Sequence, residues 1–248
     1  MGLKSDKNSV AGEEKEIKNA STVALSRETE NNLEIFMTKR KKDLPFLGGF
    51  HVFPGGEMDE EDHHPESLKR CIGLTPGEAK GILKDSDPHK SLGHFVAAIR
   101  ELYEETGILL AYDASSKDYP DLGGDETKER FENNRNMINE GKMTMKEMME
   151  EENLCYAVDE LVYFYHRVAP KFAPVRFNAR FFIVKIPDGQ TPTPHENEIE
   201  GCEWLTPQEI LAKSRKREIL LAPPTMLSLR ILAKFNTFED LMEEFKGV

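Results

Sequence analysis

The stretch AAIRELYEETGI, residues 97–108, has the apolar spacing of the last turns of a helix that ends at Gly107. It places Glu101, Glu104 and Glu105 in those turns. A helix C-terminus carries roughly half a negative charge and favours cations by about 0.3–1 kcal/mol. Glu101 and Glu105 are also a like-charge pair four residues apart, which is unfavourable. Because local electrostatics oppose this arrangement, we expect the three acids to serve a functional site.

The three glutamates share one side of the predicted helix. At about 100° per residue, positions 101, 104 and 105 span an arc of roughly 100°. Converging carboxylates are a donor set for a hard divalent cation such as Mg²⁺, which prefers oxygen ligands and retains part of its water. The residues alone leave a solvated acidic face as the alternative.

Two segments together carry a family resemblance. GGEMDEED at 55–62 and RELYEETG at 100–107 resemble the motif of the Nudix hydrolases, GX5EX7REUXEEXGU, in which U is an apolar residue. Gly56 matches the first glycine and Asp62 stands where the family has its first glutamate. The second half of the motif is filled from Arg100 to Ile108. The resemblance implies a mixed β-sheet between helices, an α/β (α+β) fold of Nudix type.

The spacing within the motif departs from the compact form. Gly56 and Arg100 are 44 positions apart instead of 14, so 30 extra residues divide the motif. An insertion here resembles the acyl-CoA diphosphatase branch of peroxisomal type. The segments HRVAPKFAPVRFNARFFIV and LAPPTMLSLRILAKF are similar to further parts of that branch. We therefore predict one Nudix domain over 21–248, with insertions at about 63–92 and 113–155, after a mobile tail over 1–20.

The resemblance also implies roles for individual residues. Mg²⁺, or Mn²⁺ in its place, would be held by a set of oxygen donors: the Gly55 carbonyl, Glu101, Glu104, Glu105 and Glu198. Glu196 and Glu200 share the strand face of Glu198 by the period of two and are alternatives to it. Glu101 or Glu104 would orient or deprotonate the attacking water. Arg100 would pair with Glu104, four residues away, and hold that carboxylate in place.

The implied reaction is hydrolysis of a pyrophosphate linked to a nucleoside. For this branch the substrate is CoA or acyl-CoA, cut to 3′,5′-ADP and (acyl-)4′-phosphopantetheine. Arg40, Arg176 and Arg180 are the candidates for binding substrate phosphates, and apolar insertion residues such as Met145 and Met148 are candidates for an acyl channel. Two alternatives stay open: an enzyme for ADP-ribose or another nucleoside diphosphate, and a non-catalytic nucleotide-binding module.

Local patterns predict several elements. Thr75 with Glu78 and Thr206 with Glu209 have capping-box spacing, with proline at the first helical position. A longer helix is expected from near Ser91 to Thr106. Strands are expected in the segments STVAL, LEIFMTKR, GGFHVFPGG, ILLAY, ELVYFYHRVAP, RFFIVKIP and GCEWL.

Bulk composition restricts the partners. The net charge of −12 argues against nucleic acid, and no apolar run reaches the roughly 18–20 residues of a membrane span. Three scattered cysteines without CxxC spacing suit a reducing compartment. We expect a cytoplasmic protein that acts on a small-molecule nucleoside diphosphate derivative. The sequence leaves a homodimer open.

Overall fold

The computed structural model describes residues 16–30, 32–195 and 198–245. Its main sheet has the strand order β10-β2-β1-β9-β8, with β3 added to β2 and β4 to β1. Only the pairing of β1 with β9 is parallel in this sheet, so the sheet is mixed. The strands are β1 (Ile17–Thr29), β2 (Asn32–Arg40), β3 (His51–Val52), β4 (Gly55–Glu57), β8 (Val162–Val168), β9 (Arg176–Lys185) and β10 (Ile199–Leu205).

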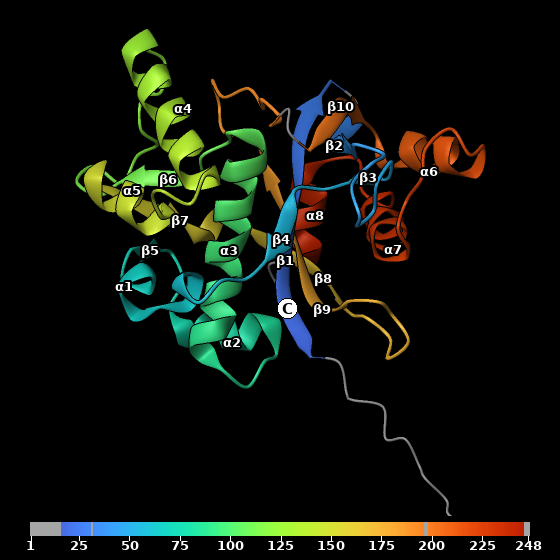
Figure 1. Ribbon diagram of the computed structural model, residues 1–248, viewed down its shortest axis with the longest axis horizontal. Coiled ribbons are helices and arrows are strands. Elements are labelled where there is room, and N and C mark those ends of the chain that lie inside the picture. Colours follow the sequence, from blue (N-terminus) through green and yellow to red (C-terminus); the bar gives the residue numbers. More distant parts are fainter. Residues whose placement is uncertain (1–15, 31, 196–197, 246–248) are drawn as a thin grey trace, which may run out of the picture.

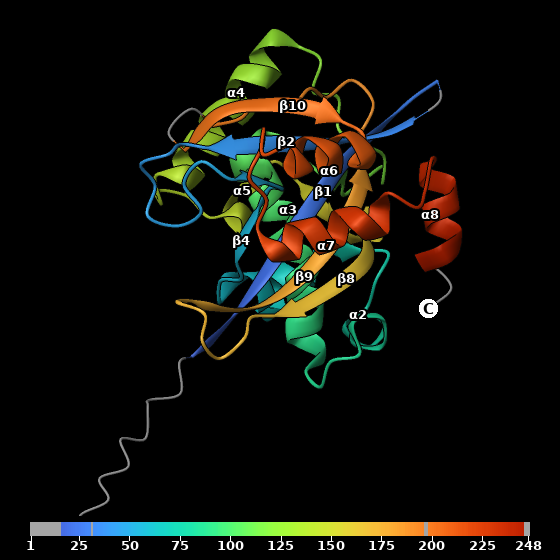
Figure 2. The same ribbon diagram turned by 90° about the vertical axis from the view of Figure 1, so that its right-hand side faces the viewer.

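Successive side chains of the sheet pack into two separate cores, as the period of two in a strand requires. On β1, Val23 and Leu25 belong to the core beneath the helix α3 (Pro88–Thr106), whereas Ala24 belongs to the core on the other face. That second face is covered by α6 (Pro207–Arg215), α7 (Pro223–Leu232) and α8 (Phe238–Phe245). Figure 2 shows α6 and α7 on the side of the sheet opposite α3. The predicted sheet between helices is confirmed.

The helix α3 starts earlier than predicted. Asp87 caps it by accepting hydrogen bonds from the amides of His89 and Lys90, and Pro88 occupies the first helical position. The predicted start near Ser91 was therefore three residues late. The helix ends as expected, because Gly107 adopts a left-handed conformation (φ 73°) and its amide bonds to the Tyr103 carbonyl.

The two insertions form one structure rather than two. The short strand β5 of the first insertion pairs with β7 of the second, and β6 completes this three-stranded sheet. Figure 1 shows these elements gathered on the far side of α3 from the main sheet. Their bounds are α1 (Pro65–Leu68), β5 (Cys71–Ile72), α2 (Pro76–Leu83), β6 (Ala111–Asp113), α4 (Asp125–Asn139), α5 (Met145–Glu151) and β7 (Leu154–Ala157), with 3-10 turns at Glu61–His63 and Val158–Glu160.

Two further expectations need correction. Strand β1 begins at Ile17, inside the predicted tail, because residues 17–26 pair in parallel with β9; residues 1–15 and Glu196 lie outside the described residues.

Met145 and Met148 do not line a channel. Their side chains are 3% and 0% exposed and fill the core beneath the insertion. No helix in the described ranges is long and apolar enough to cross a membrane.

Candidate active site

The carboxylates of α3 meet the turn between β3 and β4. A side chain at Gly56 would collide with the Glu101 carboxylate, whose Oε1 lies 2.5 Å from the position of an added Cβ. Glycine is therefore needed for Glu101 to approach the backbone this closely. The neighbouring Gly55 backbone lowers the pKa of Glu105, against the larger effect of burial. The two halves of the sequence motif, which 44 positions separate, are thus in direct contact.

Arg100 organises the acids from the buried side of the helix. Its Nε and Nη2 each donate to one Asp62 carboxylate oxygen at 2.9 Å, and Asp62 is only 3% exposed. Its Nη1 donates to Glu101 at 2.8 Å and to Glu104 at 3.2 Å. The expected pairing with Glu104 is present. Such a planar guanidinium can hold several carboxylates at fixed positions.

The surroundings of the three glutamates disfavour their ionised form. Burial, and then the charge of Glu101, raises the pKa of Glu105 to about 8, and burial raises the pKa of Glu101 to about 7. The pKa of Glu104 is also raised by burial, partly offset by Arg100. Glu105 Oε2 is buried without a hydrogen-bond partner among the described residues. A buried, unpaired carboxylate oxygen is costly unless a cation or proton satisfies it.

Glu198 and Arg40 lie at the other side of the acids. A cavity of about 300 Å³ is lined by the three helix glutamates and by Glu198, together with Asn136, Asn139, Glu140, His195 and Ile199. Arg40 Nη2 donates to Glu198 at 2.9 Å, and the Glu198 carbonyl accepts from the Lys41 amide at 2.8 Å. The end of β2 therefore places Glu198 opposite α3.

Comparison with known proteins gives the family. A model of the NUDT19 Nudix domain matches residues 10–232. The chain belongs to this family. Acyl-coenzyme A diphosphatase NUDT19 of Homo sapiens is 25% identical over 236 residues, which cover 84% of this chain and 62% of that protein. The putative nudix hydrolase 7 of Caenorhabditis elegans is 23% identical over 233 residues, covering 93% and 65%. The chain thus spans about three fifths of the length of these relatives.

A solved structure supports the fold. The crystal structure of a NUDIX hydrolase from Alicyclobacillus acidocaldarius aligns with a TM-score of 0.78 at 25% identity, covering 92% of this chain and 96% of that one. The predicted family and fold, those of the Nudix hydrolases, are confirmed. Nudix hydrolases generally use divalent metal ions.

The donor set of this Nudix domain fits such an ion. Five carboxylates line one cavity, three of them with a raised pKa, and one buried oxygen lacks a hydrogen-bond partner among the described residues. Within the described ranges, no three such side chains already stand close enough to hold an ion in this conformation. An open arrangement suits Mg²⁺, which retains several waters, better than a closed all-protein cage.

Two predicted substrate residues lie elsewhere. Arg180 is 4% exposed and donates to Asp85 at 2.7 Å, in the turn before α3. Arg176 is buried at the start of β9, paired in register with Ile17. Neither lines the acid cavity in the described part of the chain. Arg40 is the one candidate of the three that the fold brings to the acids.

Sequence reasoning missed the contribution of the second insertion. Asn136 and Asn139 of α4 line the cavity, and so do Glu140, which follows the helix, and His195 of the segment before β10. The polar composition of α4 indicated an exposed helix and carried no signal of its position. The backbone amide of His195 bonds to the Glu105 carbonyl, a contact across 90 positions that no local pattern reveals.

Proposed function

We propose that this chain hydrolyses the pyrophosphate bond of a nucleoside diphosphate derivative with the help of Mg²⁺ or Mn²⁺, and that the derivative is CoA or acyl-CoA. The products would be 3′,5′-ADP and (acyl-)4′-phosphopantetheine. One observation carries the proposal: five carboxylates line one cavity, and Glu105 Oε2 among them is buried with no hydrogen-bond partner in the described part of the chain. A module that only binds a nucleotide has no need to pay the desolvation of these acids.

The roles follow from the contacts. Glu101, Glu104, Glu105 and Glu198 would hold the metal. When bound there, a divalent cation neutralises charge on the diphosphate oxygens and lowers the pKa of a water molecule. Arg100 holds Glu101 and Glu104 through Nη1, while its Nε and Nη2 donate to Asp62. Glu104, whose side chain is 20% exposed, would orient the attacking water.

We keep the Gly55 carbonyl as a candidate metal ligand. The Gly55 backbone also lowers the pKa of Glu105 and so partly opposes the effect of burial, which is the largest influence on that pKa.

The choice of CoA rests on the family. Curated relatives of this chain from Homo sapiens and Xenopus laevis are named acyl-coenzyme A diphosphatases. CoA differs from ADP-ribose by its 3′-phosphate and its pantetheine arm. A charge-assisted contact to a phosphate contributes roughly 1.5–3 kcal/mol, about ten- to a hundredfold in kcat/KM. Arg40, whose side chain is 18% exposed beside Glu198, is our candidate for this contact.

The test is a substrate comparison with product identification. Purified protein with Mg²⁺ is given CoA, a medium-chain acyl-CoA, 3′-dephospho-CoA and ADP-ribose, and products are identified by mass spectrometry. We expect 3′,5′-ADP from CoA, and a kcat/KM ten- to a hundredfold above that for 3′-dephospho-CoA. Arg40→Ala should remove most of this difference. Faster cleavage of ADP-ribose than of any CoA species would overturn the substrate, whereas no cleavage of any diphosphate would overturn the enzyme.

A further inference from the structure

The C-terminal carbonyls of α3 have an unusual set of partners. The last four carbonyls of a helix have no partner within it. Here the Tyr103 carbonyl accepts from the Gly107 amide at 2.8 Å, as in an ordinary glycine cap. The Glu105 and Thr106 carbonyls accept from the amides of His195 at 3.1 Å and Thr193 at 2.7 Å. The helix that carries the acids is therefore tied to the segment that leads to Glu198.

The remaining carbonyl is bound by the second insertion. The Glu104 carbonyl accepts from Arg135 Nε at 2.9 Å and from Asn139 Nδ2 at 3.3 Å. Arg135 Nη1 also donates to the Thr193 carbonyl at 2.8 Å. One guanidinium from α4 thus bridges α3 and the 193–195 segment.

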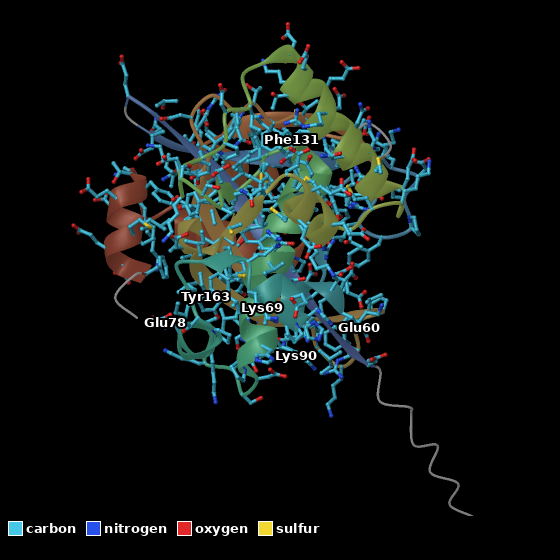
Figure 3. The ribbon with its side chains drawn as sticks, turned by 90° about the vertical axis from the view of Figure 1, so that its left-hand side faces the viewer. Glu60, Lys69, Glu78, Lys90, Phe131 and Tyr163 are labelled. Atoms are coloured by element: carbon cyan, nitrogen blue, oxygen red, sulfur yellow. The ribbon has the colours of Figure 1, made fainter. Side chains whose placement is uncertain are left out.

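Arg135 is buried, and the surrounding fold leaves space for its side chain. Arg135 is 7% exposed, and burial lowers its pKa. Gly107 makes room for it: an added Cβ there would lie 3.1 Å from Arg135 Nη1. Figures 1 and 3 show α4, on which Phe131 is labelled, beside the C-terminal end of α3. A buried cation at a helix C-terminus offsets the negative end of the helix dipole, where the sequence places three acids.

We propose that Arg135 is a positioning residue that sets the distance between the two carboxylate groups of the metal site, Glu104 and Glu105 on one side and Glu198 on the other. The inference rests on the proposed function, because it assumes that these acids bind a metal. It extends that function in one respect: the inserted α4 is part of the active site, and the metal site is incomplete without it. Asn139 has the same role through its weaker contact to the Glu104 carbonyl.

The experiment compares variants of α4. Arg135→Met removes both bridging hydrogen bonds and the charge, Arg135→Lys keeps the charge but can reach only one carbonyl at a time, and Asn139→Ala removes only the second contact. Arg130→Ala is the matched control, since Arg130 lies on the same helix and bonds to Glu152 at 2.9 Å, away from α3. Mn²⁺ binding to the folded proteins is measured by electron paramagnetic resonance, and amide exchange is followed at residues 193–195.

We expect Arg135→Met to weaken Mn²⁺ binding about ten- to a hundredfold, as removal of an outer-shell partner does. Arg135→Lys should lie between this variant and the wild type, and Asn139→Ala should show a smaller loss. In Arg135→Met and Arg135→Lys, the Thr193 and His195 amides should exchange faster in the metal-free protein. Arg130→Ala should match the wild type in both measurements.

Three results separate the two proposals. If the wild type binds no Mn²⁺ and Glu105→Gln behaves like it, the metal site of the proposed function fails. If the wild type binds Mn²⁺ and all Arg135 and Asn139 variants bind it equally, Arg135 has no positioning role and the proposed function stands. If Arg135→Met does not fold, Arg135→Lys and Asn139→Ala decide, and unchanged Mn²⁺ affinity in both would overturn the inference.

Discussion

Some glutamates of this protein lie at helix N-termini and others at a helix C-terminus, and the two environments shift the pKa of these glutamates in opposite directions. At the N-termini of α2, α5 and α6, Glu78, Glu147 and Glu209 complete capping boxes with a threonine. The backbone amide of that threonine lowers the pKa of each of them. At the C-terminus of α3, burial raises the pKa of Glu101, Glu104 and Glu105. The capping glutamates therefore stabilise their helices, whereas burial of the α3 glutamates makes their ionisation unfavourable.

The difference shows how a functional acid can be distinguished from a structural one. A capping glutamate is satisfied by groups within three residues of it, so its contribution is complete once the helix forms. The α3 glutamates depend on Arg100, on the β3–β4 turn and on segments more than 30 residues away. An acid that the local fold opposes and the tertiary structure encloses is a candidate for binding a cation.

Removing one carboxylate from each group should give the largest contrast. We expect Glu104→Gln and Glu105→Gln each to lower kcat by about two orders of magnitude or more, roughly 2.7 kcal/mol of activation free energy, because a metal ligand is lost. Glu209→Gln should leave kcat within a factor of two. Steady-state assays at saturating Mg²⁺ measure both. Near-normal turnover in the two α3 variants would show that these acids do not bind the catalytic ion.

The contributions of the α3 glutamates and of the capping glutamates to the free energy of unfolding should change with pH in opposite directions. In the metal-free protein, the pKa of Glu105 is about 8 and that of Glu101 about 7, above the value near 4.5 of an unfolded chain. Between about pH 4.5 and 8 the folded state binds more protons, so the free energy of unfolding falls as pH rises, by up to about 1.4 kcal/mol per pH unit for each proton. The capping glutamates have a lowered pKa, so their contribution is lost as pH falls below about 4.5.

Urea unfolding at several pH values in the presence of a chelator measures this dependence. Glu105→Gln should flatten the decline between pH 5 and 8, and Glu209→Gln should leave that decline unchanged while reducing the loss below pH 4.5. A wild-type free energy of unfolding that stays constant or rises from pH 5 to 8 would contradict the burial of the α3 acids.

A divalent cation should stabilise the folded protein only through the α3 glutamates. Binding to the folded state alone contributes about 1.4 kcal/mol at a ligand concentration ten times Kd. We expect Mg²⁺ at millimolar concentration to raise the Tm of the wild type and of Glu209→Gln. The Tm of Glu105→Gln should stay the same with and without Mg²⁺. Above about pH 8, where both carboxylates are ionised in the metal-free protein, the free energy of unfolding of Glu105→Gln should exceed that of the wild type by a few tenths of a kcal/mol, because a like-charge pair is removed. Equal Tm values with Mg²⁺ and with chelator in the wild type would mean that the α3 acids are merely solvated.

The same contrast explains what the sequence could and could not predict. The capping boxes at Thr75 and Thr206 were predicted correctly because every participant lies within three positions. The helix glutamates were predicted as a site because the conflict with the helix dipole is also local. Arg180 was a candidate for binding substrate phosphates, and the sequence does not show that Asp85, 95 positions away, pairs with it.

Contacts between distant segments account for the other misses. Strand β1 starts at Ile17 because β9, more than 150 residues later, provides its parallel partner. The two-residue strand β5 is stable only because β7 of the other insertion pairs with it. Arg135 gives no sign of its role, since α4 has the composition of an exposed charged helix. Each of these features is decided by packing that no sequence window contains.

The smallest effect on the acid site is expected where a capping threonine is removed. Thr206 accepts a hydrogen bond from the Glu209 amide at 3.2 Å, and its own amide and hydroxyl donate to the Glu209 carboxylate. Thr206→Ala should lower the free energy of unfolding by about 1 kcal/mol, the usual contribution of an N-cap. Because α6 lies on the face of the sheet opposite α3, kcat and the Mg²⁺ response of Tm should stay at wild-type values. Urea unfolding and steady-state assays on the same preparation check this. A loss of Mg²⁺ response in Thr206→Ala would mean that the two groups of glutamates are coupled through the sheet, and that the capping acids cannot be treated as independent of the site.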